Sequence, residues 1–264
     1  MKELLRVFKI GGNVVEDELI LRDFLAGFAN VKGPKILVHG GGKWVSEMSR
    51  KIGIEVQMID GRRVTDADTL EVVKMMLAGV ANKNVVGMLQ GMGCNAIGLT
   101  GADGDAIRAV KRPVRNGLDF GLVGDVTAVN SHNINLLLRA DFVPVFAAMT
   151  HDGAGQMFNT NADTIASAIA TGLAELYEVD LVYCFELPGV LSDMGDKNSV
   201  IGKIDSEDYT RLKNEGIINK GMLPKLDNAF EALKKGVRTV RICHASQIRL
   251  FGSPSHDFGT IIML

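Results

Sequence analysis

Short, uninterrupted runs of aliphatic residues alternate with amphipathic segments along this chain, and this alternation limits the possible folds more than any other feature. In residues 68–90, for example, Leu70, Val73, Leu77 and Ala81 recur at three- and four-residue steps, as on one face of a helix. Strands that are apolar throughout need cover on both faces, as in a parallel sheet between helices. The pattern therefore predicts an α/β fold with a mainly parallel sheet, whose strands include residues 4–10, 35–38, 95–99, 142–147, 180–184 and 238–242.

The composition is that of an ordinary globular protein. Of the 264 residues 47% are hydrophobic and 23% are charged, and the formal net charge is −2, so neither nucleic acid nor an acidic membrane is expected as a partner. No apolar run approaches the roughly 18 residues of a membrane span. The three cysteines and five histidines show no metal-ligand spacing. We expect buried free thiols, no protein-held metal and a cytoplasmic location.

The chain is expected to form one domain, residues 1–264, with two lobes. Residues 122–129 alternate in polarity as a hairpin or an edge strand does, and His151-Asp152-Gly153 is typical of a turn. We place the lobe change at this turn, which gives lobes of approximately 1–150 and 151–264.

Two of the predicted strands end in glycine-rich loops. The first closes with residues 9–12 (KIGG), which include Lys9, and the second runs into residues 39–42 (HGGG). Glycine lets the backbone approach a phosphate without a Cβ, successive N–H groups form an anion-binding concavity, and the lysine adds a mobile charge. We expect His39 to be a core or loop histidine with a satisfied hydrogen bond. The two loops predict an anion site, and phosphate chemistry in particular.

Other nucleotide-binding motifs fit poorly. Residues 91–96 (GMGCNA) match G-x-G-x-x-A, but they follow a long helix and precede a strand, which is the reverse of the order in dinucleotide-binding folds. We interpret them as a helix end and a turn. The sequence contains no G-x-x-x-x-G-K-[ST] motif, which excludes a P-loop enzyme.

Three further groups of polar residues could contact a ligand. Arg62 and Arg63 precede a predicted helix and together could clamp a carboxylate, although taken alone this motif favours solvated surface arginines. Residues 158–163 (FNTNAD) place two amides and a carboxylate before an apolar helix, which is more than one helix N-cap needs. Lys225 lies near the start of the amphipathic segment 221–235. Spacing alone leaves a solvent-facing role open for Arg62, Arg63 and Lys225.

Together, these segments resemble the amino acid kinase family and, within it, the N-acetyl-L-glutamate kinases of arginine biosynthesis. The resemblance covers the whole chain and rests on motifs in family order: KIGG at 9–12, HGGG at 39–42, G-x-R-V-T at 61–65, A-G-x-A-N-K at 78–83, N-x-N-A-D at 159–163, G-M-x-x-K at 221–225 and G-T-x-I at 259–262. It implies a three-layer αβα sandwich with an open, mainly parallel central sheet of about eight strands. The N-terminal lobe would bind the acylglutamate and the C-terminal lobe would bind ATP.

The resemblance also implies roles for individual residues. Lys9 and Lys225 would stabilise the transferring phosphoryl group, and Asp163 would hold the two lysines in place. The acylglutamate would be bound by Gly41, Gly42, Arg63 and Asn159. The nucleotide would be bound by Gly11, Gly12, Glu186, Leu187, Pro188, Gly189, Val190, Leu191, Ile217, Ile218 and Asn219. Mg²⁺ would enter as the cofactor of ATP, held largely by phosphates and water.

The chain also departs from its relatives. Residues 185–187 (FEL) stand where relatives usually have Thr or Ser, Asp and Val, so we expect a reshaped nucleotide pocket. Arg62 stands where relatives often carry an apolar residue, which leaves N-succinyl-L-glutamate open as a phosphoryl acceptor beside N-acetyl-L-glutamate. A non-catalytic binding or regulatory protein is a further alternative, against which the retention of both lysines weighs.

The resemblance further implies a homodimer. The arginine-inhibited relatives carry an additional N-terminal helix that links dimers into hexamers, whereas only three residues precede the first predicted strand here. We expect two copies of the chain to pair through the long helix at residues 68–90.

Overall fold

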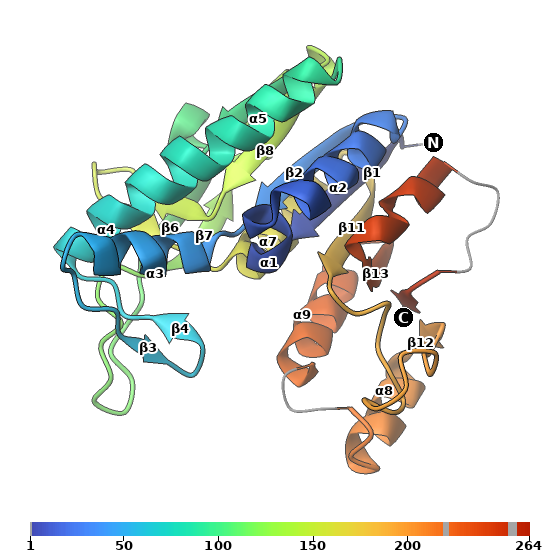
Figure 1. The fold of residues 1–264 in the computed structure, drawn as a ribbon. Coiled ribbons are helices and arrows are strands. Elements are labelled where there is room, and N and C mark those ends of the chain that lie inside the picture. Colours follow the sequence, from blue (N-terminus) through green and yellow to red (C-terminus); the bar gives the residue numbers. More distant parts are fainter. Residues whose placement is uncertain (1, 219–221, 253–257) are drawn as a thin grey trace.

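The computed structural model describes residues 2–218, 222–252 and 258–264, and Figure 1 shows how the elements are arranged. Eight strands form the central sheet in the order β12-β14-β13-β11-β1-β2-β8-β5. Among the described strands of this sheet, only β13 and β14 pair antiparallel. The predicted mainly parallel sheet is thereby confirmed, and its strands are β1 (Leu4–Ile10), β2 (Lys35–His39), β5 (Ala96–Leu99), β8 (Val143–Ala147), β11 (Glu178–Phe185), β12 (Lys203–Ile204), β13 (Thr239–His244) and β14 (Thr260–Ile262).

Helices cover both faces of this sheet, which completes the predicted three layers. One layer contains α2, α5 and the 3₁₀ segment η3, and the other contains α6, α7 and α9. The helices are α1 (Gly12–Glu16), α2 (Glu18–Asn30), α3 (Gly42–Lys51), α4 (Ala67–Val73), α5 (Asn82–Gly91), α6 (Ser131–Arg139), α7 (Ala162–Leu173), α8 (Ser206–Asn214) and α9 (Leu223–Lys234), with 3₁₀ segments η2 (Asp103–Asp105) and η3 (Ala245–Gly252).

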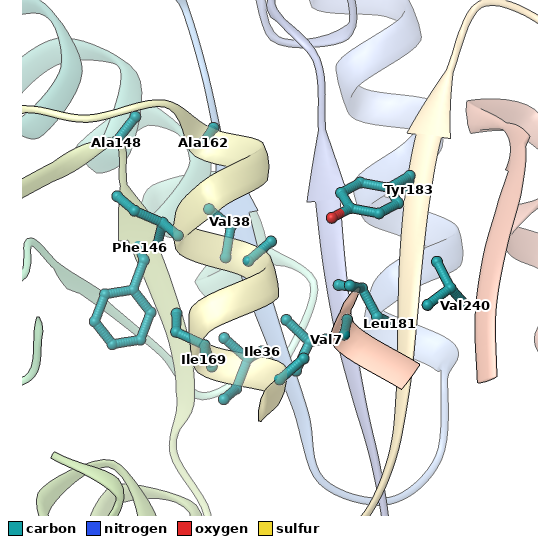
Figure 2. Close-up of a cluster of buried hydrophobic side chains, with 14 of the residues drawn as sticks. Val7, Ile36, Val38, Phe146, Ala148, Ala162, Ile169, Leu181, Tyr183 and Val240 are labelled. Atoms are coloured by element: carbon teal, nitrogen blue, oxygen red, sulfur yellow. The ribbon is translucent and has the colours of Figure 1, made fainter. Parts of the chain in front are cut away.

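Both faces of the central strands are buried, as their continuous apolar sequences require. In β1, Val7 points to the layer of α7, and Phe8 packs in the opposite layer. Figure 2 shows Ile169 of α7 among strand side chains that include Val7 and Leu181. Because side chains alternate along a strand, Lys9 lies on the same face as Val7, toward α7. The cysteines Cys94, Cys184 and Cys243 are buried and free, as predicted.

A continuous helix of 25 residues, Ala67–Gly91, crosses one side of the molecule. It consists of α4, a π-helical segment η1 (Lys74–Ala81) and α5, and it confirms the helix predicted for residues 68–90. By length and composition alone it could span a membrane. Its apolar face, with Leu70, Val73, Leu77 and Leu89, is buried in the protein core, as in a core helix. The chain then turns after Gly91 and enters β5, as the GMGCNA segment predicted.

A smaller sheet extends the N-terminal half. It has the order β10-β9-β6-β7 and contains β6 (Ile107–Lys111), β7 (Gly124–Val129), β9 (Met149–His151) and β10 (Met157–Asn159). Strand β7 pairs antiparallel with β6, as expected for residues 122–129. The turn predicted at residues 151–153 joins β9 to β10, so it lies inside one hairpin of this sheet. The division into lobes near residue 150 stays a prediction.

The order of the strands creates one switch point. Strand β1 lies between β2 and β11, and all three run parallel. Their carboxyl ends therefore open on the same edge, where the loop after β1, the glycine loop after β2 and Phe185 at the end of β11 meet. In open α/β sheets, ligands bind outside the strand ends at such a switch point.

Candidate active site

A buried ion pair lies at the end of β1. Lys9 is 7% exposed, and its Nζ is 2.7 Å from Oδ1 of Asp163 in the first turn of α7. Asn161 caps this helix, because its Oδ1 accepts hydrogen bonds from the N–H groups of Asp163 and Thr164 at 2.7 and 3.2 Å. The cap and the helix dipole favour a carboxylate at this position. The FNTNAD segment thus supplies one cap and one carboxylate that holds a lysine.

Lys225, in the first turn of α9, lies within electrostatic range of this ion pair. Burial lowers the pKa of Lys225, the nearby Asp163 raises that pKa, and Lys9 lowers it. The two ammonium groups and one carboxylate therefore act on one another, and their formal charges sum to +1. The three residues to which the resemblance assigned catalysis come from β1, α7 and α9, and the structure brings them together.

Phe185 lies against both lysines, and the sequence reasoning gave it no role in the site. The ring centroid of Phe185 is 3.5 Å from the Nζ of Lys225 and 5.0 Å from the Nζ of Lys9. In the sequence this residue stood out only as part of the FEL segment, where the family resemblance led us to expect Thr or Ser.

The two glycine loops touch. The N–H of Gly40 donates to the carbonyl of Ile10, with an N–O distance of 3.3 Å. Gly41 is the N-cap of α3 and has φ = +139°, and a Cβ on it would lie 3.0 Å from the side chain of Leu77. Only glycine accepts this conformation readily. Glycine at position 41 is therefore needed for the close approach of the loop to the long helix.

Glu16, which the sequence reasoning missed, caps α3 from the end of α1. Its Oε1 accepts the N–H groups of Lys43 and Trp44, at N–O distances of 2.8 and 3.4 Å. The amides of Gly41 and Gly42 are not among those that Glu16 binds. The N-terminus of α3 therefore keeps amides that a further anion could use.

Arg63 of β4 (Arg62–Arg63) lies beside the same loop. The side chain is buried, and its Nη2 donates to the carbonyl of Gly42 at 2.6 Å and to Oγ of Ser46 at 2.8 Å. Its Nη1 is buried and has no hydrogen-bond partner within the described part of the chain. Burial, with a smaller contribution from Arg50, lowers the pKa of Arg63. A buried donor without a partner is costly, so the geometry favours an anionic ligand here.

Asn159 reaches this region from β10. Its Nδ2 donates to Oγ1 of Thr65 at 3.0 Å, and that hydroxyl donates to the carbonyl of Arg63 at 3.3 Å. The structure therefore brings together Asn159, Arg63 and the loop around Gly42, three predicted substrate contacts. Thr65 belongs to a recognised motif, but its linking role, like that of Ser46, was not predicted.

Arg62 is not brought to this cluster. It is exposed, and successive strand residues point to opposite faces, so Arg62 points away from Arg63. It lines a separate hollow of about 400 Å³ with Arg112 and Arg115, among other residues. Arg112 in turn donates two hydrogen bonds to Asp125.

The predicted nucleotide residues fall into two groups. Glu186 accepts a hydrogen bond from Asn13, next to Gly11 and Gly12, and lines a hollow of about 460 Å³ that includes Lys43. The second group serves the core: the side chains of Val190, Leu191 and Ile218 are buried. Gly189 is buried, Leu187, Pro188 and Ile217 are half-buried, and Asn219 lies outside the described residues.

His39 is a core histidine, as predicted. It is fully buried, its Nε2 is 3.1 Å from Nδ2 of Asn82, and its Nδ1 is 2.8 Å from the carbonyl oxygen of Gly40. Burial lowers the pKa of His39 to about 4. The imidazole is therefore neutral near pH 7 and fixes the end of β2 under the glycine loop.

Comparison with known proteins identifies the family. The profile of the amino acid kinase family matches residues 5–244. The chain belongs to the amino acid kinase family. Among curated relatives, an acetylglutamate kinase from Cytophaga hutchinsonii is 52% identical over 244 residues, which are 92% of each protein. An acetylglutamate kinase from Phocaeicola vulgatus is 52% identical over 248 residues, which are 94% of this chain and 96% of that protein.

Solved structures agree on the fold. The crystal structure of smu.665 from Streptococcus mutans UA159 is 27% identical to this chain and covers 98% of both chains, with a TM-score of 0.74. The N-acetylglutamate synthase of Neisseria gonorrhoeae, complexed with coenzyme A and N-acetyl-glutamate, gives a TM-score of 0.83 over 98% of this chain and 59% of its own. At 19% identity the second likeness concerns the fold alone.

Proposed function

We propose that this amino acid kinase is an acetylglutamate kinase, which transfers the γ-phosphoryl group of ATP to the γ-carboxylate of N-acetyl-L-glutamate in arginine biosynthesis. The names of its 52% identical relatives support this activity. Within the site, the observation that carries the proposal is Arg63, a buried guanidinium beside the glycine loop whose Nη1 has no partner among the described residues. A carboxylate of the acceptor would supply the missing oxygen.

The acceptor needs no general base. The γ-carboxylate of an acylglutamate has an ordinary pKa of about 4.3, so it is already ionised near pH 7. The difficulty is to bring this anion in line with the γ-phosphate of ATP, which is also anionic. Catalysis therefore consists of positioning and of charge stabilisation.

Lys9 and Lys225 are suited to this stabilisation. Together with the carboxylate of Asp163, their two ammonium groups carry a net charge of +1, which favours the binding of an anionic phosphoryl group. Asp163 keeps the ammonium of Lys9 at a fixed place, with its own carboxylate oxygen 2.7 Å away. We propose that the two lysines contact the transferring phosphoryl oxygens and that Asp163 acts as their positioning residue.

The acceptor would lie on the side of β2 and α3. In this proposal the amides of Gly41 and Gly42 bind one of its anionic groups, Arg63 pairs with its α-carboxylate and Asn159 contacts the same molecule. The cap that Glu16 forms on Lys43 and Trp44 orients this helix end without occupying the two glycine amides.

ATP would lie on the side of β11, with the glycine loop of Gly11 and Gly12 near its phosphates and Glu186 beside that loop. Kinases of this type use a divalent metal, and we propose Mg²⁺, which neutralises charge on the phosphates when bound. The described residues contain no cluster of three or more histidine, cysteine or acidic side chains that could hold a metal. The carboxylate of Asp163 is engaged by Lys9. The site therefore fits a metal carried mainly by the nucleotide.

N-succinyl-L-glutamate has one observation in its favour as acceptor, the basic hollow that Arg62 lines with Arg112 and Arg115. Two facts weigh against it. Arg62 points away from the buried Arg63, and Arg112 already donates two hydrogen bonds to Asp125. We therefore propose the acetyl compound, and the comparison of both acceptors decides between them.

Trapping of the acyl phosphate by hydroxylamine tests the proposal. The purified chain is incubated with ATP, Mg²⁺ and hydroxylamine, and with N-acetyl-, N-succinyl- or free L-glutamate. We expect the hydroxamate to form fastest with N-acetyl-L-glutamate. Faster product formation with the succinyl compound would show that N-succinyl-L-glutamate, and not the acetyl compound, is the preferred phosphoryl acceptor. No product with any acceptor, while ATP–Mg²⁺ still raises the melting temperature, would support a non-catalytic binding protein.

We further propose that the enzyme is a cytoplasmic homodimer. The outward side of the long helix exposes apolar residues, with Met75 51% and Val80 43% exposed. Both side chains lie in the segment 68–90, through which we expect two copies of the chain to pair.

A further inference from the structure

Phe185 places an aromatic ring face against both lysines of the site. The ring centroid lies 3.5 Å from the Nζ of Lys225 and 5.0 Å from the Nζ of Lys9, so the contact with Lys225 is the closer one. An ammonium over a ring is attracted by the quadrupole of the ring, and the attraction is stronger where water is excluded. Lys9 is buried and Lys225 is half-buried, so the contact lies in such a place.

The ring of Phe185 packs against a second aromatic ring on the same strand. Tyr183, two residues earlier on β11, stacks on Phe185 with ring centroids 6.0 Å apart and planes 11° apart. Tyr183 is 2% exposed, and its hydroxyl lies 3.5 Å from the carbonyl oxygen of Asp163. Figure 2 shows the Tyr183 side chain directed toward α7, the helix that carries Asp163. The position of the Phe185 ring is thereby linked to the helix that supplies the carboxylate.

The ring also faces the glycine loop after β1. A Cβ on Gly11 would be 3.9 Å from Cδ1 of Phe185 and 4.0 Å from Nζ of Lys9. The ring, the ammonium group and the loop backbone therefore border one space. That space is the one to which the proposed function assigns the phosphates of ATP.

We propose that Phe185 is a positioning residue, which holds the ammonium group of Lys225, and more weakly that of Lys9, until phosphoryl oxygens replace the ring as their partner. The inference rests on the proposed function for what the lysines do. The contact between ring and ammonium stands independently of it.

A ring suits this task better than a second carboxylate. Asp163 already holds Lys9 at 2.7 Å, and another carboxylate beside Lys225 would cancel the remaining positive charge of the cluster. It would also repel the phosphates that the cluster has to bind. The ring attracts the ammonium without a net charge, so it keeps Lys225 in place and leaves the cluster at +1.

The test measures the pKa of Lys225 directly, in the absence of substrates. The full chain is acetylated with a trace of acetic anhydride between pH 7 and 11, and the extent of labelling at Lys225 is read by mass spectrometry. We compare wild type with Phe185→Leu, which keeps an apolar side chain and removes the ring. Because the ring favours the charged form, its removal should lower the pKa of Lys225 by roughly 0.4 to 1.5 units.

Three further variants make the test specific. Phe251→Leu is the matched control, because its ring lies 5.9 Å from the guanidinium of Arg241 on the other face of the sheet. Phe185→Tyr should leave the pKa of Lys225 close to its wild-type value, since tyrosine keeps an aromatic ring at this position. If Phe185→Leu does not fold, as judged by circular dichroism, Phe185→Met replaces it. The proposal is overturned if the pKa of Lys225 is unchanged or raised in Phe185→Leu, or if Phe185→Tyr lowers it as much as Phe185→Leu does.

Kinetics adds a second readout and separates the two proposals. With an active wild type, Phe185→Leu should lower kcat, with the KM for the acylglutamate unchanged, because the ammonium group of Lys225 then has to be ordered in each turnover, and Phe185→Tyr should recover kcat. An unchanged kcat in Phe185→Leu overturns the positioning role. A wild type that forms no acyl phosphate refutes the proposed function instead, and the labelling experiment still decides whether the ring holds Lys225.

Discussion

Replacement of Arg63 is the perturbation that probes the acceptor site most directly. Its Nη2 is engaged by the carbonyl of Gly42 at 2.6 Å and by Ser46 at 2.8 Å, while its buried Nη1 has no partner in the described chain. Arg63→Met keeps the long apolar stem and removes the guanidinium. A hydrogen bond to a charged group contributes about 1.5 to 3 kcal/mol, so losing the bond to the acceptor should raise KM for N-acetyl-L-glutamate about 10- to 150-fold.

The neighbouring arginine supplies the matched control. Arg62→Met removes the same group one residue earlier, on the exposed face of β4, and should change KM less than about twofold. Arg63→Lys should fall between wild type and Arg63→Met, because lysine keeps the charge without the planar fork. The assay is hydroxamate formation with the acylglutamate varied at saturating ATP–Mg²⁺. Equal effects of Arg62→Met and Arg63→Met on KM, or no effect of Arg63→Met, would refute the assignment of the acceptor carboxylate to Arg63.

Three other predictions follow from the same structure. Lys9→Ala should lower kcat about 100- to 1,000-fold with a smaller change in KM for ATP, measured by hydroxamate formation, and an unchanged kcat would rule out its role in the transition state. The pKa of His39 falls from 6.5 to about 4 on folding, so its contribution to stability is present above pH 6.5 and is lost as the pH falls toward 4. Between pH 7 and 5, urea unfolding should show wild type losing about 2 kcal/mol more than His39→Gln, and equal losses would contradict the shift. Met75→Glu on the long helix should give monomers in light scattering, whereas Leu136→Glu on α6, equally exposed, should leave the dimer intact.

The central strands could be predicted because burial on both faces leaves a local trace in the sequence. Residues 4–10 coincide with β1, and the other five predicted runs overlap β2, β5, β8, β11 and β13. The edge strand β12 and its neighbour β14 have two and three residues, too few to show a pattern. The order of the strands also could not be predicted from local sequence patterns, because β1 pairs with a strand that begins at Glu178, far away in the chain. The switch point therefore became visible only in the structure.

The candidate site likewise contains residues that the sequence could indicate and contacts that it could not. Its glycine loops and lysines lie in short motifs, so the sequence and its family resemblance could point to them. Other contacts join distant segments: Asn13 bonds Glu186 across 173 positions, and Phe185 meets Lys225 from another element. Such pairs leave no periodicity in the sequence. The departure at Phe185 was visible, but nothing in the sequence indicated which cations lie against its ring.

In the substrate-free site, the cationic groups are held by described partners that together add one negative charge, that of Asp163. The carboxylate of Asp163 holds Lys9, the neutral ring of Phe185 lies against Lys225, and neutral oxygens of Gly42 and Ser46 accept hydrogen bonds from one nitrogen of Arg63. These partners fix the cations before the substrates arrive, so little reorganisation is left for the reaction itself. They also preserve positive charge where two anions have to meet. The neutral ring of Phe185 fits this arrangement, because it can hold an ammonium group without opposing the phosphate that replaces it.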